Sequence, residues 1–235
     1  MMGNIKKGKG FKFPPIKRVK ISATYKKIQV SVPDAPVSEV LPDRITFYVD
    51  NRFTTKQVNR IRQMIGVVLN NWRNHFDELN NGAHRSRYQN CVNKYARFNL
   101  APVWFDEKLS NGSAAAGVQM DGFTTMIAVN GFDRAAKAYI MYQKSGSSTI
   151  KGMNASNPEK ASLSVTINAT ALDNTSVSTI FLGGSLQHAW LHREGYRHPI
   201  GKYISYFAGE ASMCVMRGNN DKTSTPANTY TKWLD

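Results

Sequence analysis

The stretch HAWLHREGYRHP, residues 188–199, guides the interpretation of the whole chain. It holds three of the five histidines, His188, His192 and His198, at spacings of four and six. Residues four apart lie on one face of a helix, so His188 and His192 can present both imidazoles to one point. Gly195 can adopt a left-handed conformation at little steric cost, and a turn there brings His198 back under the helix.

Three histidines that converge on one point, with a fourth position left for water, describe a catalytic zinc site. We therefore expect His188, His192 and His198 to bind Zn²⁺. The other two histidines, His75 and His84, are isolated in the sequence, and we expect surface or capping roles for them.

The segment HAWLHREGYRH resembles the motif HExxHxxGxxH of the metzincin zinc peptidases. In that family the three histidine positions bind zinc, the glycine makes the turn, and a turn containing methionine lies beneath the metal. The resemblance implies a zinc metallopeptidase domain that cleaves peptide bonds in a peptide or protein substrate, bound along an edge strand. Within ASMCVMRG (211–218), it implies that the methionine of the turn is Met216 or Met213.

The chain departs from the motif at one position, where Ala189 replaces the glutamate of the family. That glutamate takes a proton from the zinc-bound water and passes it to the leaving amine, and alanine can do neither. We expect zinc binding to persist and hydrolysis to fall by about 10²- to 10⁴-fold. Glu194, about 200° around the helix from His192, and Glu210 are the nearby acids, and we expect both to be surface or structural residues.

Two explanations of Ala189 stay open. One is a Glu→Ala change made to trap an intact substrate or to prevent self-cleavage, which leaves a catalytically disabled metallopeptidase. The other is a natural pseudoenzyme that keeps the metal as a structural clamp within a larger, virus-like assembly.

Outward from the motif, hydrophobic periodicity predicts the elements of the fold. Apolar residues at spacings of three and four predict a helix over 56–76, capped by Thr54 or Thr55, and a second helix is expected over 177–193. We expect a loop at 81–90 and a short closing helix in 225–235. β-branched and aromatic runs predict strands at 21–32, 45–50, 95–105, 117–122, 124–132, 138–144 and 161–169.

This order predicts an α+β fold, a zincin/metzincin-like mixed twisted sheet with two long helices and a short C-terminal subdomain. We expect three parts. Residues 1–43 form a basic N-terminal arm and linker, residues 44–198 form an upper zinc-peptidase-like subdomain that contains the zinc helix, and residues 199–235 form a short lower subdomain with the candidate methionine turn.

The charge is concentrated at the start of the chain. The formal net charge is +15, and residues 1–30 carry nine Lys or Arg and no acid. Such an arm can bind an acidic protein surface or a nucleic acid. The sequence shows no paired-carboxylate cluster and no Gly-rich phosphate loop, which disfavours a nucleic-acid enzyme.

Signals of location are weak. No apolar run reaches the length of a membrane span, and no apolar segment of the kind found in a secretory signal peptide follows the first charges. Cys91 and Cys214 permit one disulfide. We expect an intracellular protein or a component of a particle assembled inside a cell.

Overall fold

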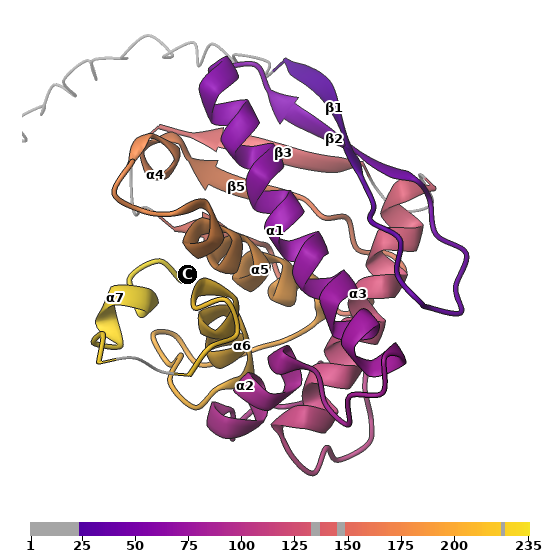
Figure 1. The fold of residues 1–235 in the computed structure, drawn as a ribbon. Helices are drawn as coiled ribbons and strands as arrows, with labels where there is room; N and C mark the ends of the chain where they lie inside the picture. Colours follow the sequence, from indigo (N-terminus) through magenta and orange to yellow (C-terminus); the bar gives the residue numbers. More distant parts are fainter. Residues whose placement is uncertain (1–23, 133–136, 145–148, 222–223) are drawn as a thin grey trace, which may run out of the picture.

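In this computed structural model, the helix that holds the start of the histidine motif packs on a mixed β-sheet. The structure describes residues 24–132, 137–144, 149–221 and 224–235. Within these ranges the fold is α+β, with five strands and seven helices (Figure 1). Most of the predicted basic arm, residues 1–23, lies outside the described residues, so its binding partner stays a prediction.

The sheet has a parallel centre and antiparallel edges. Its order is β1-β2-β3-β5-β4, with β2, β3 and β5 parallel and with β1 and β4 antiparallel to their neighbours. The strands span Tyr25–Ser31 (β1), Arg44–Asp50 (β2), Ala138–Gln143 (β3), Ile150–Lys151 (β4) and Val165–Asn168 (β5). The strands predicted at 21–32, 45–50, 138–144 and 161–169 are thereby confirmed in position, with residues 21–23 of the first lying outside the described part of the chain. β1 lies in the segment predicted as arm and linker.

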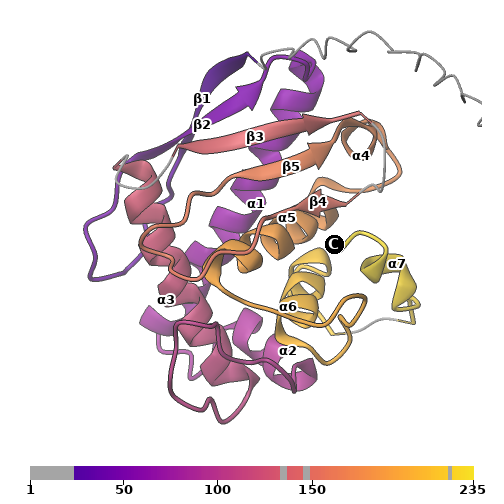
Figure 2. The same cartoon turned by 180° about the vertical axis from the view of Figure 1, so that it is seen from behind.

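One face of the sheet forms the core. Along β2, the side chains of Ile45, Phe47 and Val49 are fully buried, while the intervening Tyr48 is partly exposed. This period-2 alternation is typical of a strand with one covered face. Figure 2 shows that α1 and α5 lie behind the sheet, on a single side of it.

Both predicted long helices form. Helix α1, Thr55–Asn80, begins with a capping box in which Thr54 and Gln57 exchange side-chain to backbone hydrogen bonds. Helix α5, Thr179–Glu194, packs beside α1 on the sheet. The apolar stripe of α1 that the periodicity predicts is buried and includes Val58, Ile61, Ile65, Val68 and Trp72.

A third long helix replaces two predicted strands. Residues 117–122 and 124–132 were predicted as strands, which is wrong, because Gly112–Gly131 forms one helix, α3. The side chain of Asn111 caps it by accepting hydrogen bonds from the backbone N–H groups of Ser113 and Ala114. Polar residues such as Gln119 and Asn130 occupy its buried positions, so hydrophobicity alone gives no clear helical stripe.

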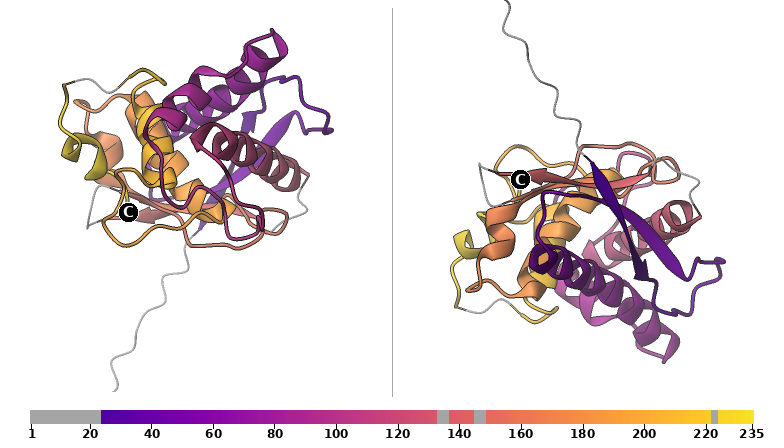
Figure 3. Two further views of the ribbon diagram at one scale, coloured as in Figure 1. Left: turned by 90° about the horizontal axis from the view of Figure 1, so that it is seen from below. Right: turned by 90° about the horizontal axis from the view of Figure 1, so that it is seen from above.

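The segment predicted as a strand at 95–105 is also irregular, apart from one bridge between Phe98 and Tyr206. The predicted loop at 81–90 holds instead the start of α2, which Ser86 caps. A disulfide between Cys91 and Cys214 joins α2 to α6. Figure 3 shows the ribbon of the molecule from below and from above. The remaining helices are Arg87–Tyr95 (α2), Ala169–Asp173 (α4), Phe207–Met216 (α6) and Asn228–Thr231 (α7), the last being the predicted closing helix.

Candidate metal centre

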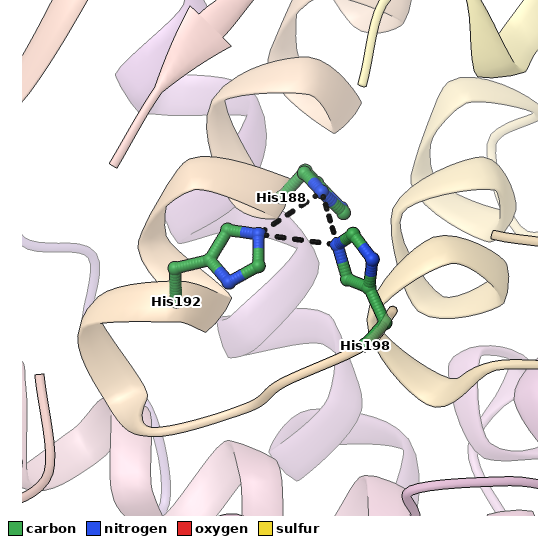
Figure 4. Close-up of side chains that lie close together, drawn as sticks. All are labelled: His188, His192 and His198. Carbon is green, nitrogen blue, oxygen red and sulfur yellow. Dashed lines mark hydrogen bonds between the residues drawn. The ribbon is translucent and has the colours of Figure 1, made fainter. Parts of the chain in front are cut away.

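The helix α5 ends where the motif requires it to end. Ser178 caps its start by accepting a hydrogen bond from the backbone N–H of Phe181, and Gly195 stops it with φ at 104°. A side chain at Gly195 would be strained at this φ and would press against the indole of Trp104. The left-handed turn at Gly195 reverses the chain, so that His198 returns beneath the helix (Figure 4).

The three motif histidines meet at one point. The Nε2 atom of His188 lies 3.2 Å from that of His192, and the Nε2 atom of His198 lies 3.3 Å from each of the others. Nitrogen ligands at about 2.0–2.1 Å from a tetrahedral zinc ion are about 3.3 Å apart. The three nitrogens therefore have the spacing of one triangular face of a zinc tetrahedron, and the cluster can hold a metal ion.

The opposite ring nitrogens fix the tautomers. The Nδ1 atoms of His188, His192 and His198 lie 3.2, 3.2 and 2.9 Å from the backbone oxygens of Ala208, Tyr196 and Pro199, respectively. A carbonyl oxygen only accepts, so each Nδ1 carries the proton and each Nε2 presents a lone pair. Three lone pairs that face one another at this distance repel, and a shared cation is the group that satisfies all three.

Burial keeps two of these imidazoles neutral. It lowers the pKa of His188 well below its ordinary value, and the neighbouring imidazoles of His192 and His198 lower it further. Burial and the neighbouring His198 also lower the pKa of His192 to about 4. The neutral ring is the form that binds a metal, so both are ready to do so at neutral pH without losing a proton.

A carboxylate that the sequence did not point to borders the cluster. The Oδ1 atom of Asp235 lies 3.5 Å from Nε2 of His188 and 3.8 Å from Nε2 of His192. This oxygen is buried and accepts no hydrogen bond of normal geometry from the described residues. Burial raises the pKa of Asp235 to about 6. Backbone hydrogen bonds from Asp235 itself and from Gly152, and electrostatic attraction to His198 and Lys151, oppose this rise of the pKa. No motif spacing links this residue to the histidines.

Ala189 is fully buried in α5, directly after the first ligand. The segment that follows β4 runs against it, because a Cβ atom at Gly152 would collide with the carbonyl oxygen of Ala189. The end of the edge strand β4 therefore lies on the backbone of the metal-binding helix, at the residue where the family motif has its glutamate.

The two acids considered as substitutes for that glutamate make their contacts elsewhere. Both carboxylate oxygens of Glu194 accept hydrogen bonds from the Gln119 side chain, at 3.2 and 3.0 Å. Burial raises the pKa of Glu194 well above its ordinary value. Glu210 is buried in the first turn of α6 and accepts a hydrogen bond from the backbone N–H of Ser205 at 3.0 Å. These contacts give both residues structural roles.

The two candidate methionines do not lie in a turn. Met213 and Met216 are both buried within helix α6, and Met216 packs against Gly184 of α5. The same helix supplies the Ala208 carbonyl to His188, so it lies beneath the metal cluster even though the predicted turn is absent.

The remaining histidines differ from each other. His84 is exposed, as expected, but His75 is buried, and its Nδ1 lies 2.8 Å from the hydroxyl of Ser86, the residue that caps α2. Of the surface or capping roles predicted for His75, the surface role is wrong, because its ring is buried beside Phe76 and Tyr88.

Within the described ranges, no helix has both the length and the apolar character needed to cross a membrane.

Comparison of the chain with protein-family models, with curated protein sequences and with solved structures finds no match. The likeness to metzincins therefore rests on the sequence motif alone, and the structure adds that its three histidines lie within metal-binding distance of one another.

Proposed function

We propose that this chain is a zinc-binding protein with a metzincin-like centre, in which peptide hydrolysis is disabled by alanine at position 189. The observation that carries the proposal is the convergence of three Nε2 lone pairs at zinc-ligand spacing, with each Nδ1 proton held by a carbonyl. Three imidazoles are a common ligand set for zinc.

The residues around the cluster support a peptide as substrate. β4 is an edge strand, paired only with β5 among the described residues, and its end lies against α5. An extended peptide can pair with such an edge through backbone hydrogen bonds. A bound zinc ion would polarise a peptide carbonyl and acidify a water molecule. The side chain that should accept the proton of that water is absent at Ala189.

The metal part of the proposal is tested by titrating the metal-free chain with Zn²⁺ against a chromophoric chelator. We expect one zinc ion per chain. His188→Ala, His192→Ala and His198→Ala should each abolish tight binding, because each removes one of three ligands. His84→Ala changes an exposed histidine and serves as the matched control, which should bind like the unchanged chain.

The peptidase part is tested with Ala189→Glu, assayed on a mixed protein substrate after zinc loading. Ala189→Gln is the control, because it has the same size without the base. Both are assayed with Asp235 intact and with Asp235→Asn, since that carboxylate borders the cluster. In at least one of the two backgrounds, the glutamate variant should cleave at least about 10²-fold faster than the alanine and glutamine forms.

The outcomes separate the two parts. A chain that binds no zinc contradicts the proposal as a whole. A chain that binds one zinc ion, but whose glutamate variants cleave nothing in either background, contradicts the peptidase part and leaves the metal a structural role.

A further inference from the structure

We propose that Asp235 is the fourth ligand of the metal, so that a carboxylate of the chain closes the position that a catalytic site leaves open to water. This inference rests on the metal site of the proposed function and assigns a residue outside the histidine motif. Structural zinc sites have four protein ligands, whereas catalytic sites have three and a water molecule. The fourth ligand therefore determines whether a zinc ion bound to this conformation would be a structural ion or a catalytic one.

The position of the carboxylate fits that role. Its Oδ1 atom lies 3.5 Å from Nε2 of His188 and 3.8 Å from Nε2 of His192. Neighbouring ligand atoms of a tetrahedral zinc ion are separated by about 3.3 Å, so the oxygen lies just outside that spacing and must move towards the three nitrogens to enter the coordination sphere. The side chain of Asp235 is 17% exposed, which places the carboxylate inside the protein beside the metal face of the cluster.

The oxygen that faces the cluster is unpaired by hydrogen-bond geometry in the described structure. Oδ1 of Asp235 is buried and accepts no hydrogen bond of normal geometry there, although the backbone N–H groups of Gly152 and of Asp235 itself lie near the carboxylate. A buried carboxylate oxygen without a partner is costly, and coordination to a cation removes that cost. Zinc with three neutral imidazoles carries a net charge of +2 in a buried site, so an anionic ligand also reduces the buried charge.

The segment that carries Asp235 is fixed to the metal-binding helix. The hydroxyl of Ser185, on α5, donates a hydrogen bond to the carbonyl of Trp233 at 2.6 Å. The hydroxyl of Tyr203 donates to the carbonyl of Leu234 at 3.3 Å. The side chain of Trp233 is buried and packs edge-on against Phe181. These contacts hold residues 233 and 234 in place, so the carboxylate is positioned before any metal binds.

Coordination by Asp235 has a mechanical consequence. With zinc bound, water or the carbonyl of a peptide would take the fourth tetrahedral position only when the carboxylate leaves it, and the hydrogen bonds from Ser185 and Tyr203 oppose that movement. Residues 233–235 would thus block the access of water and substrate to the metal. This block is independent of the missing base at position 189, and the two together would keep the site inactive.

The test compares the unchanged chain with Asp235→Asn, which removes the charge and keeps the size. Asp221→Asn makes the same chemical change at an exposed residue whose carboxylate pairs with Lys94, and it is the matched control. Zinc affinity is measured by chelator competition. We expect Asp235→Asn to bind zinc at least about tenfold more weakly, and Asp221→Asn to bind like the unchanged chain.

Cobalt supplies a second measurement that does not depend on affinity or on activity. Visible spectra of the Co²⁺-loaded proteins are recorded from pH 6.5 to 9. The unchanged chain and Asp221→Asn should give constant spectra, because neither has a metal-bound water to ionise. Asp235→Asn should show a transition near pH 7, since water takes the vacant position and ionises there.

The outcomes again differ from those of the proposed function. A chain that binds neither Zn²⁺ nor Co²⁺ contradicts the metal site itself. A chain that binds both ions, but in which Asp235→Asn changes neither the zinc affinity nor the pH dependence of the cobalt spectrum, contradicts this inference alone. If Asp235→Asn fails to fold, a pH-dependent cobalt spectrum of the unchanged chain still overturns it.

Discussion

At the scale of single residues, burial determines the charge of His75, His188 and His192. A buried imidazole loses the hydration that stabilises its charged form, so its pKa falls. Burial lowers the pKa of His75, like that of His192, to about 4. His75 is distant in sequence from the metal motif and bonds to the cap of α2, so its neutral ring supports the fold and is not a candidate ligand.

We predict that His75 makes the stability of the metal-free protein depend on pH. Between its free pKa of about 6.5 and its folded pKa of about 4, the unfolded chain binds a proton that the folded chain does not. The contribution of His75 to the free energy of unfolding should therefore be fully present above pH 6.5 and should be lost as the pH falls towards 4. Urea unfolding at pH 7 and pH 4.5 should show about 2 kcal/mol of loss from this residue.

The variant His75→Asn keeps a group that can bond to Ser86 but does not titrate. Its loss of stability between the two pH values should be smaller by that amount. His84→Asn, at an exposed position, should behave like the unchanged chain. Equal losses in all three proteins would show that His75 is protonated equally in the folded and unfolded states.

The residues of the candidate site fall into two groups, those that local sequence spacing predicts and one that it does not. The positions of His188, His192 and His198 follow from the helical period and from one glycine, so local spacing predicts them. Asp235 reaches the cluster only through the path of the whole chain from α6 to α7 and back to α5. No local pattern encodes that path, and the burial of His75 is hidden from the sequence for the same reason.

At the scale of elements, the metal helix owes its position to close packing against α6. A Cβ atom at Gly184 would collide with the Met216 side chain and lie 2.6 Å from the carbonyl oxygen of Ser212. Glycine therefore permits the approach of the two helices. The same approach places the Ala208 carbonyl of α6 at 3.2 Å from Nδ1 of His188.

We predict opposite effects for two glycine-to-alanine changes in helices. Alanine is about 1 kcal/mol better than glycine inside a helix. At Gly66 of α1 a new Cβ atom meets nothing within 4 Å, so Gly66→Ala should raise the free energy of unfolding by about 0.5–1 kcal/mol. At Gly184 the clash with backbone outweighs the same gain, and Gly184→Ala should lower it by at least about 1 kcal/mol.

Urea unfolding of the two variants beside the unchanged chain measures both effects. Gly184→Ala should also weaken zinc binding, because it moves α6 and its carbonyl away from His188, whereas Gly66→Ala should not. A stabilising Gly184→Ala variant with unchanged zinc affinity would mean that α5 and α6 are not in close contact.

The helix α3 shows why one element escapes prediction from sequence. Its buried positions recur at spacings of three and four but include Gln119, Thr124 and Asn130. These polar side chains find partners only in the folded protein: Thr124 accepts from the Trp72 indole, and Asn130 bonds to Leu163 and Ala161. A stripe built from such residues does not look apolar, whereas α1, with an aliphatic stripe, was predicted correctly.

At the scale of the whole molecule, one covalent bond joins helices that are remote in sequence. The disulfide between Cys91 of α2 and Cys214 of α6 spans 123 residues. The guanidinium of Arg217 lies over the rings of Tyr95 and Tyr230, 5.4 Å from each ring centre, and joins the same region to α7. Disulfides persist in oxidising compartments and are rare in the cytosol, and the intracellular location expected from the sequence stays a prediction.

We predict that this bond stabilises both the fold and the metal centre. A cross-link that closes so long a loop restricts the unfolded chain, and removal of a native disulfide typically costs about 2–5 kcal/mol. Reduction of the metal-free protein should lower its free energy of unfolding by an amount in that range, measured by urea unfolding with and without a reductant. The double variant Cys91→Ala with Cys214→Ala should be equally destabilised and insensitive to the reductant.

The effect should extend to zinc because α6 carries both the disulfide and the carbonyl that orients His188. When the cross-link is lost, α6 is held against α5 by packing alone, and the fixed tautomer of His188 becomes less secure. The double variant, titrated without reductant, should therefore bind zinc more weakly than the unchanged chain by about tenfold. Unchanged zinc affinity in a double variant that is clearly destabilised would show that the α5–α6 packing at the site forms independently of the bond. In that case the disulfide would stabilise the packing of α2 on α6 and not the metal centre.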